Sequence, residues 1–181
     1  MPAQADFDSG LAAYHKQDFA TALKEWQPLV DQGNPRALRN VGLMYLLGQG
    51  VKANPDKAIE FLQKAVDGND PEAMRIMAQV YIDGRVPKLG QSLPMGTELL
   101  RRASSLGDTE AQYQLAKLLY RAENLQAAIP LLATAANNGH KAAALTLAQI
   151  LEMGVGVKKD QAEADKYYAM AGGKPKDIKQ K

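Results

Sequence analysis

Apolar residues recur along this chain at spacings of three and four, which is the pattern of a helix with one buried face. The segment that begins at Pro35 shows the pattern most clearly. Its inward positions are Leu38, Val41, Gly42, Tyr45 and Leu46. A second stripe runs from about Pro55 to Val66, and the glycines and Asn54 between the two stripes are signals that end one helix and begin the next. The pattern predicts a hairpin of two helices.

The same hairpin returns along the chain at a nearly constant period. The alanines near the start of its first helix lie 32 to 38 residues apart, at Ala37, Ala73, Ala111 and Ala143. Periods of this length are typical of stacked helical hairpins, because each hairpin needs a neighbour to bury its apolar face. We therefore expect an all-α fold, a right-handed α/α solenoid of about five helix-turn-helix repeats.

Glycine and Asx residues mark the boundaries between the expected repeats. They divide a solenoid over residues 6–172 into units at 6–34, 35–70, 71–108, 109–140 and 141–172. Residues 85–95 are expected to form a longer loop, since they contain two prolines and a glycine. Residues 1–5 read as the remnant of a signal peptide or as a flexible N-terminus, and residues 173–181 as a basic flexible tail.

Composition supports this fold class and excludes several functions. Hydrophobic residues make up 46% of the 181 residues and aromatic residues only 6%, which suits close packing of alanine-rich helices. The net charge of +2 is too small for the field that nucleic-acid binding needs. The longest apolar run, Val41 to Leu47, is too short for a transmembrane segment. Without cysteine the chain has no disulfide, thiolate metal site or cysteine nucleophile.

No group of residues in the sequence has the composition and spacing of a catalytic or metal site. The two histidines, His15 and His140, have no second histidine or carboxylate at helical metal-ligand spacing. The glycine-rich loops carry no Gly-Lys-Ser/Thr sequence, so they do not predict a phosphate site. We therefore expect no catalytic residue, no metal and no cofactor. Four methionines are expected to fill the core: Met44, Met74, Met77 and Met153.

One unit, residues 35–70, carries the repeated motif in its fullest form. The matching positions are Ala37, Val41, Gly42, Met44, Tyr45, Gly48, Gly50, Val51, Lys57, Ala58, Lys64, Ala65 and Gly68. This motif resembles the Sel1-like repeats of the tetratricopeptide superfamily, and the resemblance extends from about residue 6 to residue 172. It implies an adaptor, a secretion-linked binding protein or a regulator. A cysteine-rich branch is linked to β-lactam binding and hydrolysis, but this chain lacks those cysteines and departs from the motif at residues 121–124.

A partner is expected on the concave side of the solenoid, which the first helix of each unit usually faces. The candidate positions lie beside the core stripes of those helices: Arg36, Arg39, Leu43, Arg75, Gln79, Tyr113, Lys117, Tyr120 and Gln149. Arginine and tyrosine often anchor protein interfaces. The alternative is structural, because isolated basic side chains are normally solvated and the two tyrosines would also fit as contacts to a neighbouring hairpin.

These observations predict a non-catalytic module that binds a protein or peptide partner, as a monomer or weak homo-oligomer. Three alternatives stay open: an envelope-associated enzyme such as a β-lactam or cell-wall hydrolase, an immunity protein that neutralises a secreted toxin, and a homo-oligomer stacked through its terminal repeats. The small residues at 1–5 favour a bacterial periplasmic or secreted protein, with a cytoplasmic one as the alternative.

Overall fold

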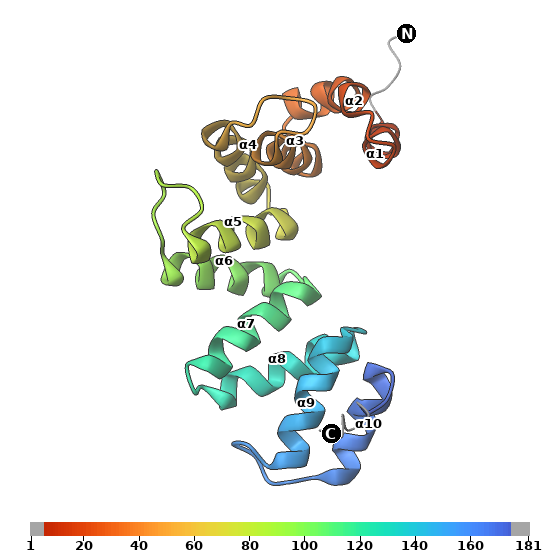
Figure 1. The fold of residues 1–181 in the computed structure, drawn as a ribbon, viewed down its shortest axis with the longest axis vertical. Coiled ribbons are helices and arrows are strands. Elements are labelled where there is room, and N and C mark those ends of the chain that lie inside the picture. The colour runs from red at the N-terminus through yellow and green to blue at the C-terminus, as the bar shows by residue number, and fades with distance from the viewer. Residues whose placement is uncertain (1–5, 175–181) are drawn as a thin grey trace, which may run out of the picture. The chain divides into compact units, whose positions relative to one another are not determined.

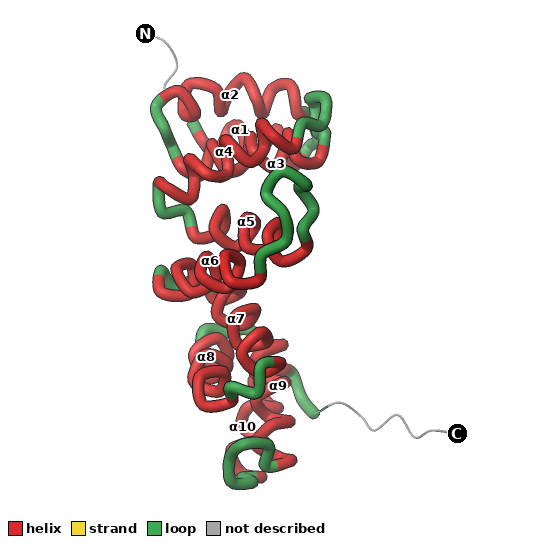
Figure 2. Tube along the Cα trace, turned by 90° about the vertical axis from the view of Figure 1, so that its left-hand side faces the viewer, coloured by secondary structure: helices red, strands yellow, loops and turns green. Residues whose placement is uncertain are grey.

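The structure is a computed structural model that describes residues 6–174. Across those residues the chain forms ten α-helices and no strand (Figures 1 and 2). They are α1 Phe7–His15, α2 Phe19–Asp31, α3 Pro35–Leu47, α4 Pro55–Asp67, α5 Pro71–Asp83, α6 Leu93–Ser105, α7 Thr109–Arg121, α8 Leu125–Asn137, α9 Lys141–Met153 and α10 Gln161–Ala171. The prediction of an all-α repeat fold is confirmed. The predictions for residues 1–5 and 175–181 lie outside the described residues.

The chain divides into two compact units, Met1–Ala103 and Ser104–Lys181. In the first unit α1 packs on α2, α2 on α3, α3 on α4 and α4 on α5. In the second unit α7 packs on α8, α8 on α9, and α9 on α10. Each of these helices therefore buries its apolar stripe against its neighbours in sequence, which is the arrangement that a hairpin repeat requires.

The first helices of successive repeats begin with the same cap. The side chains of Asn34, Asp70 and Asp108 accept a hydrogen bond from the backbone N–H three residues later, at 3.1, 2.7 and 2.6 Å. Such a bond satisfies one of the donors that the first turn of a helix leaves unpaired. At the other end, α3 stops at Gly48, whose φ of 71° is left-handed. Glycine adopts this conformation without strain.

Helix α6 begins earlier than the sequence indicated. The loop was expected to extend to residue 95, but α6 already starts at Leu93. Pro94 therefore lies in the first turn, where the N–H that proline lacks has no partner within the helix. The hydroxyl of Ser92 accepts a hydrogen bond from the Met95 N–H at 3.4 Å. The two prolines of this segment thus have different roles, since only Pro87 remains in the loop.

Small residues let the two helices of a hairpin approach closely. A Cβ atom on Gly42 of α3 would lie 3.2 Å from the Ala58 carbonyl oxygen of α4, and one on Gly96 of α6 would lie 2.9 Å from the Ala78 carbonyl oxygen of α5. In the first hairpin, a Cβ atom on Gly10 would overlap the indole of Trp26. Glycine at positions 10 and 96 is therefore a packing requirement, whereas a side chain at position 42 would fit only if α4 shifted slightly.

Three of the four methionines fill the core as predicted. Met44, Met74 and Met77 are at most 1% exposed. The prediction is wrong for Met153, which is 63% exposed. Met153 is the last residue of α9, where the chain turns away at Gly154 and no later turn of the helix covers the side chain.

Candidate functional site

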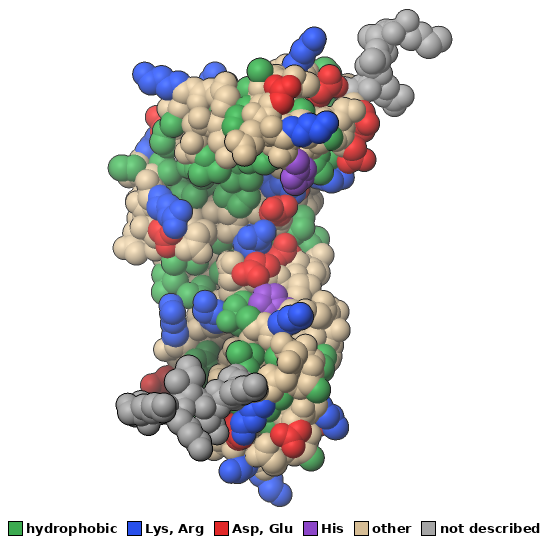
Figure 3. All heavy atoms as spheres, turned by 45° about the vertical axis from the view of Figure 1, so that its right-hand side comes forward, with side chains coloured by type: hydrophobic (Ala, Val, Ile, Leu, Met, Phe, Trp, Pro, Cys, Tyr) green, Lys and Arg blue, Asp and Glu red, His purple; other side chains and the backbone are tan. Residues whose placement is uncertain are grey.

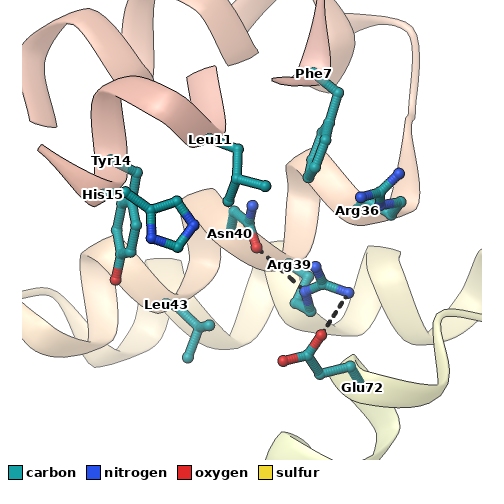
Figure 4. A pocket seen from close by; sticks show the side chains of 9 residues that line it. All are labelled: Phe7, Leu11, Tyr14, His15, Arg36, Arg39, Asn40, Leu43 and Glu72. Carbon is teal, nitrogen blue, oxygen red and sulfur yellow. Dashed lines mark hydrogen bonds and ion pairs between the residues drawn. The ribbon is translucent and has the colours of Figure 1, made fainter. Parts of the chain in front are cut away.

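A groove opens in the first unit between α1, α3 and the first turn of α5 (Figure 4). Its volume is about 270 Å³. The side chains that line it are Phe7, Leu11, Tyr14, His15, Arg36, Arg39, Asn40, Leu43 and Glu72. We call it the α1–α3 groove. Three of the predicted partner-binding residues, Arg36, Arg39 and Leu43, meet here.

Arg39 forms the charged wall of the groove. Its Nη1 donates to both carboxylate oxygens of Asp70, at 2.9 and 3.2 Å, and lies 2.9 Å from a carboxylate oxygen of Glu72. Its Nε donates to the Asn40 side chain at 3.2 Å. The Arg39 side chain is only 12% exposed and that of Asp70 only 4%. Bonds between ionised groups are strong and directional, so this wall is fixed before any partner arrives.

Asp70 has two functions in this wall. The carboxylate that receives Arg39 also caps α5 through the N–H of Ala73. The ion pair therefore links the body of α3 to the first turn of α5 and sets the position of one repeat relative to the next. Arg39 was predicted to bind a partner. In the structure its guanidinium is bonded to Asp70 and Glu72, so it links α3 to α5 at the edge of the groove.

Arg36 differs from Arg39 in its surroundings. Its guanidinium carbon lies 3.9 Å from the centre of the Phe7 ring, over the face of α1 that closes the groove. The residue is exposed, and among residues 6–174 it forms no ion pair with a carboxylate. Leu43, two helical turns further along α3, is half-buried and adds an apolar surface. The groove thus combines an apolar floor, a neutralised wall and one uncompensated cation.

The other predicted residues are not brought together in this groove. Arg75 pairs with Glu72 at 3.6 Å, and Gln79 is exposed and donates to Asp83 at 2.6 Å. In the second unit, the Lys117 Nζ lies 5.4 Å from the centre of the Tyr113 ring. Tyr120 of α7 and Gln149 of α9 are both exposed, Tyr120 to 37%.

His140 has a structural role at the start of α9. Its Nδ1 accepts a hydrogen bond from the Ala143 N–H at 3.1 Å, and its Nε2 lies 2.9 Å from a carboxylate oxygen of Glu110. These two contacts assign the proton to Nε2, because Nδ1 is the acceptor. The Tyr113 ring packs 4.4 Å from the imidazole, centre to centre. No group of three or more His, Cys, Asp or Glu residues within the described chain is placed to hold a metal ion.

A polar cluster joins α9 to α10. Tyr168 donates to the Glu152 carboxylate at 2.7 Å, and the Lys174 ammonium donates to the other carboxylate oxygen. The hydrogen bond from Lys174, followed by that from Tyr168, lowers the pKa of Glu152 below its ordinary value of 4.5. The ionised carboxylate is therefore favoured in the folded state.

This cluster predicts an acid-dependent loss of stability in the second unit. A carboxyl group whose pKa is lowered by folding stabilises the fold above its ordinary value, and this contribution disappears as the pH falls through the folded pKa. We expect Glu152→Gln to flatten the decrease in melting temperature between about pH 5 and pH 3. Thermal melts followed by circular dichroism would measure it. Equal decreases in the wild type and in Glu152→Gln would contradict the assignment, and Glu163→Gln on the surface of α10 is the matched control.

Residues of α1 are the part of the groove that the sequence did not identify. Phe7, Leu11 and Tyr14 follow one another at spacings of four and three, on one face of α1. Gly10 and Ala13 are the buried residues of α1, whereas Phe7, Leu11 and Tyr14 remain partly exposed. The signal in the sequence that could have identified them is an apolar stripe on α1 wider than the surface that α2 covers.

Comparison with known proteins identifies the same repeats that the fold shows. The model of the Sel1 repeat matches residues 35–70, 71–108, 109–140 and 141–174. The chain belongs to the Sel1 repeat family. Proteins of this family generally mediate protein–protein interactions. The hairpin at residues 6–34, which supplies α1 of the groove, precedes the four matched repeats.

Solved structures of other repeat proteins share this fold. A Sel1 repeat protein from Oxalobacter formigenes is 27% identical with a TM-score of 0.81, over 92% of this chain and 69% of that one. A protective antigen of uropathogenic Escherichia coli with the same fold is 22% identical with a TM-score of 0.80, over 92% of this chain and 37% of that one. An immunity protein from Pseudomonas aeruginosa is 24% identical with a TM-score of 0.56, over 83% and 56%. The last two similarities establish the fold alone.

Curated relatives of this Sel1 repeat chain are much longer than the matched part. An uncharacterized Neisseria meningitidis protein is 27% identical over 38% of this chain and 21% of its own length. A ubiquitin-ligase component from Arabidopsis thaliana is 33% identical over 29% of this chain and 8% of its own length. The chain thus spans about a fifth or less of these relatives. No helix within residues 6–174 has the length and apolarity needed to cross a bilayer.

Proposed function

We propose that this Sel1 repeat chain is a non-catalytic binding module that holds a segment of another protein in the α1–α3 groove. The observation that carries the proposal is the convergence of Arg36, Arg39 and Leu43 with the partly exposed aromatic and aliphatic side chains of α1. Arginine and aromatic residues anchor interfaces because they combine a large contact area with directed hydrogen bonds.

The fixed charge network supports this proposal. Arg39 is held by Asp70 and Glu72, so the wall of the groove does not need to become ordered when a partner binds. A preformed site avoids part of the entropy cost of association. On the face that Figure 3 shows, acidic and basic side chains are interspersed and form no extended field of one sign. Recognition by local contacts therefore fits this surface better than attraction to a polyanion.

Peptide display would test the groove, because a random library samples many sequences at once and needs no single chosen partner. We expect selection on the wild-type chain to enrich peptides whose affinity falls at least about tenfold in Leu43→Glu, a change of about 1.4 kcal/mol in binding free energy. The reason is that a carboxylate at residue 43 would have to be desolvated against the apolar part of the ligand.

Leu47→Glu is the matched control for that experiment. Leu47 lies one turn further along α3, is 61% exposed, and is not among the residues that line the groove. The same leucine-to-glutamate change there should leave affinity within about twofold of the wild type. A selection that enriches no peptide, or only peptides that bind Leu43→Glu as well as the wild type, would refute the proposed function.

A further inference from the structure

Three arginines in or beside the α1–α3 groove differ in how far their charges are compensated. Arg39 forms ion pairs with both Asp70 and Glu72, and Arg75 also pairs with Glu72. Arg36 has no carboxylate partner among the described residues, although it is the most exposed of the three. The one acidic side chain that lines the groove, Glu72, is already bonded to Arg39 at 2.9 Å. The uncompensated positive charge of this site therefore lies at Arg36.

The contact with Phe7 prepares Arg36 to bind an anion. The guanidinium carbon is 3.9 Å from the ring centre, so the aromatic face holds one side of the group by a cation–π interaction. A guanidinium has five N–H donors around its edge, and among residues 6–174 those of Arg36 make no hydrogen bond or ion pair. The fork of donors matches the two oxygens of a carboxylate. A long side chain that would otherwise move freely is thus restrained beside the groove.

Apolar side chains line the same groove as this cation. Phe7 and Leu11 extend from α1 toward the groove, and Leu43 lies on the α3 side (Figure 4). All three are partly exposed, so each can still bury surface against a ligand. A ligand that binds both the Arg36 cation and the apolar side chains of the groove carries a carboxylate and an aliphatic or aromatic side chain a short distance apart.

We infer that the α1–α3 groove selects acidic segments of a partner protein, in which an Asp or Glu carboxylate binds Arg36 and a neighbouring apolar side chain packs against Leu11 and Leu43. The inference rests on the proposed function, because it names the chemistry of the segment that the groove holds. Charge complementarity favours an acidic segment over a basic one, because a basic segment would place a second cation beside Arg36.

The test uses the peptides selected on the wild-type chain. We expect them to share an Asp or Glu within a few positions of a Leu, Ile, Phe or Tyr. Replacement of that acid by its amide should weaken binding to the wild type about tenfold and leave binding to Arg36→Ala unchanged, because the cation is already absent there. Arg36→Glu should weaken the acidic peptide further and strengthen a variant peptide in which the acid is replaced by lysine.

Lys64→Glu is the control for net charge, because Lys64 is an exposed residue of α4 and the change in charge is the same as in Arg36→Glu. Peptides that respond to Leu43→Glu but show no acidic preference, with equal affinity for Arg36→Glu and Lys64→Glu, would overturn this inference and leave the proposed function intact. If no peptide binds in a way that Leu43→Glu weakens, both this inference and the proposed function would be overturned. A dimer in light scattering that Leu43→Glu dissociates would also overturn the inference, because the occupant would then be a second copy of the chain.

Discussion

Replacing Trp26 by alanine should lower the free energy of unfolding of the first unit by about 4 kcal/mol. Trp26 is fully buried, and its indole N–H donates to the Phe7 carbonyl oxygen at 3.1 Å. The rings of Phe7 and Tyr14 pack on it at centre-to-centre distances of 5.7 and 5.8 Å. Its loss would leave a cavity between α1 and α2 and remove the indole hydrogen bond, and α1 has few other buried side chains.

Urea unfolding followed by circular dichroism would measure this effect. Trp26→Phe is the matched variant, because it keeps an aromatic ring and removes only the indole donor and part of the volume. We expect it to lose less than half as much stability as Trp26→Ala. Phe7 and Tyr14 also line the groove, so peptide binding should weaken in Trp26→Ala as well. A stability of Trp26→Ala within about 1 kcal/mol of the wild type would show that α1 does not depend on this contact.

Replacing Asp70 by alanine should destabilise the first unit by about 3 kcal/mol, the lower end of the range for breaking a buried ion pair. The change removes the cap of α5 and the principal partner of Arg39 together. A lost cap alone costs about 1 kcal/mol. The remainder reflects a guanidinium that is 12% exposed and retains only Glu72 as an acidic partner.

Asn34→Ala provides the comparison, because Asn34 caps α3 in the same way and has no ion pair within the described residues. We expect it to cost only about 1 kcal/mol. A double-mutant cycle of Arg39→Ala and Asp70→Ala would measure the coupling directly, with an expected value of about 1 to 3 kcal/mol. Equal losses in Asn34→Ala and Asp70→Ala would mean that the ion pair adds nothing to the cap.

The fold was largely predictable because the contacts that hold it together are close in sequence. The stripe at Leu38, Val41 and Gly42 indicates which face of α3 is buried, and the partners of that face are the helices before and after it in sequence. Glycine at position 42 is explained by the close approach of α4. Helix α6 was the exception, since Pro94 reads as a loop residue unless its place in the first turn is known.

The groove was predictable only on its α3 side. Arg36, Arg39 and Leu43 flank a clear core stripe, and their offset from it placed them on the surface. The role of Arg39 could not be predicted, because Asp70 lies 31 residues later and the pairing depends on how one hairpin stacks on the next. Phe7 and Leu11 belong to the first hairpin, which precedes the matched Sel1 repeats, so no motif marks which of its apolar residues face away from α2.

Trp26 is the sole tryptophan of the chain and lies in the first of the two compact units. Its fluorescence therefore reports on that unit alone, whereas helical circular dichroism reports on both. Coincident midpoints from the two signals would identify a single cooperative transition, and separate midpoints would assign a local stability to each half. The position of one indole thus makes it possible to ask, without labelling, whether a ligand held by the first half stabilises the second.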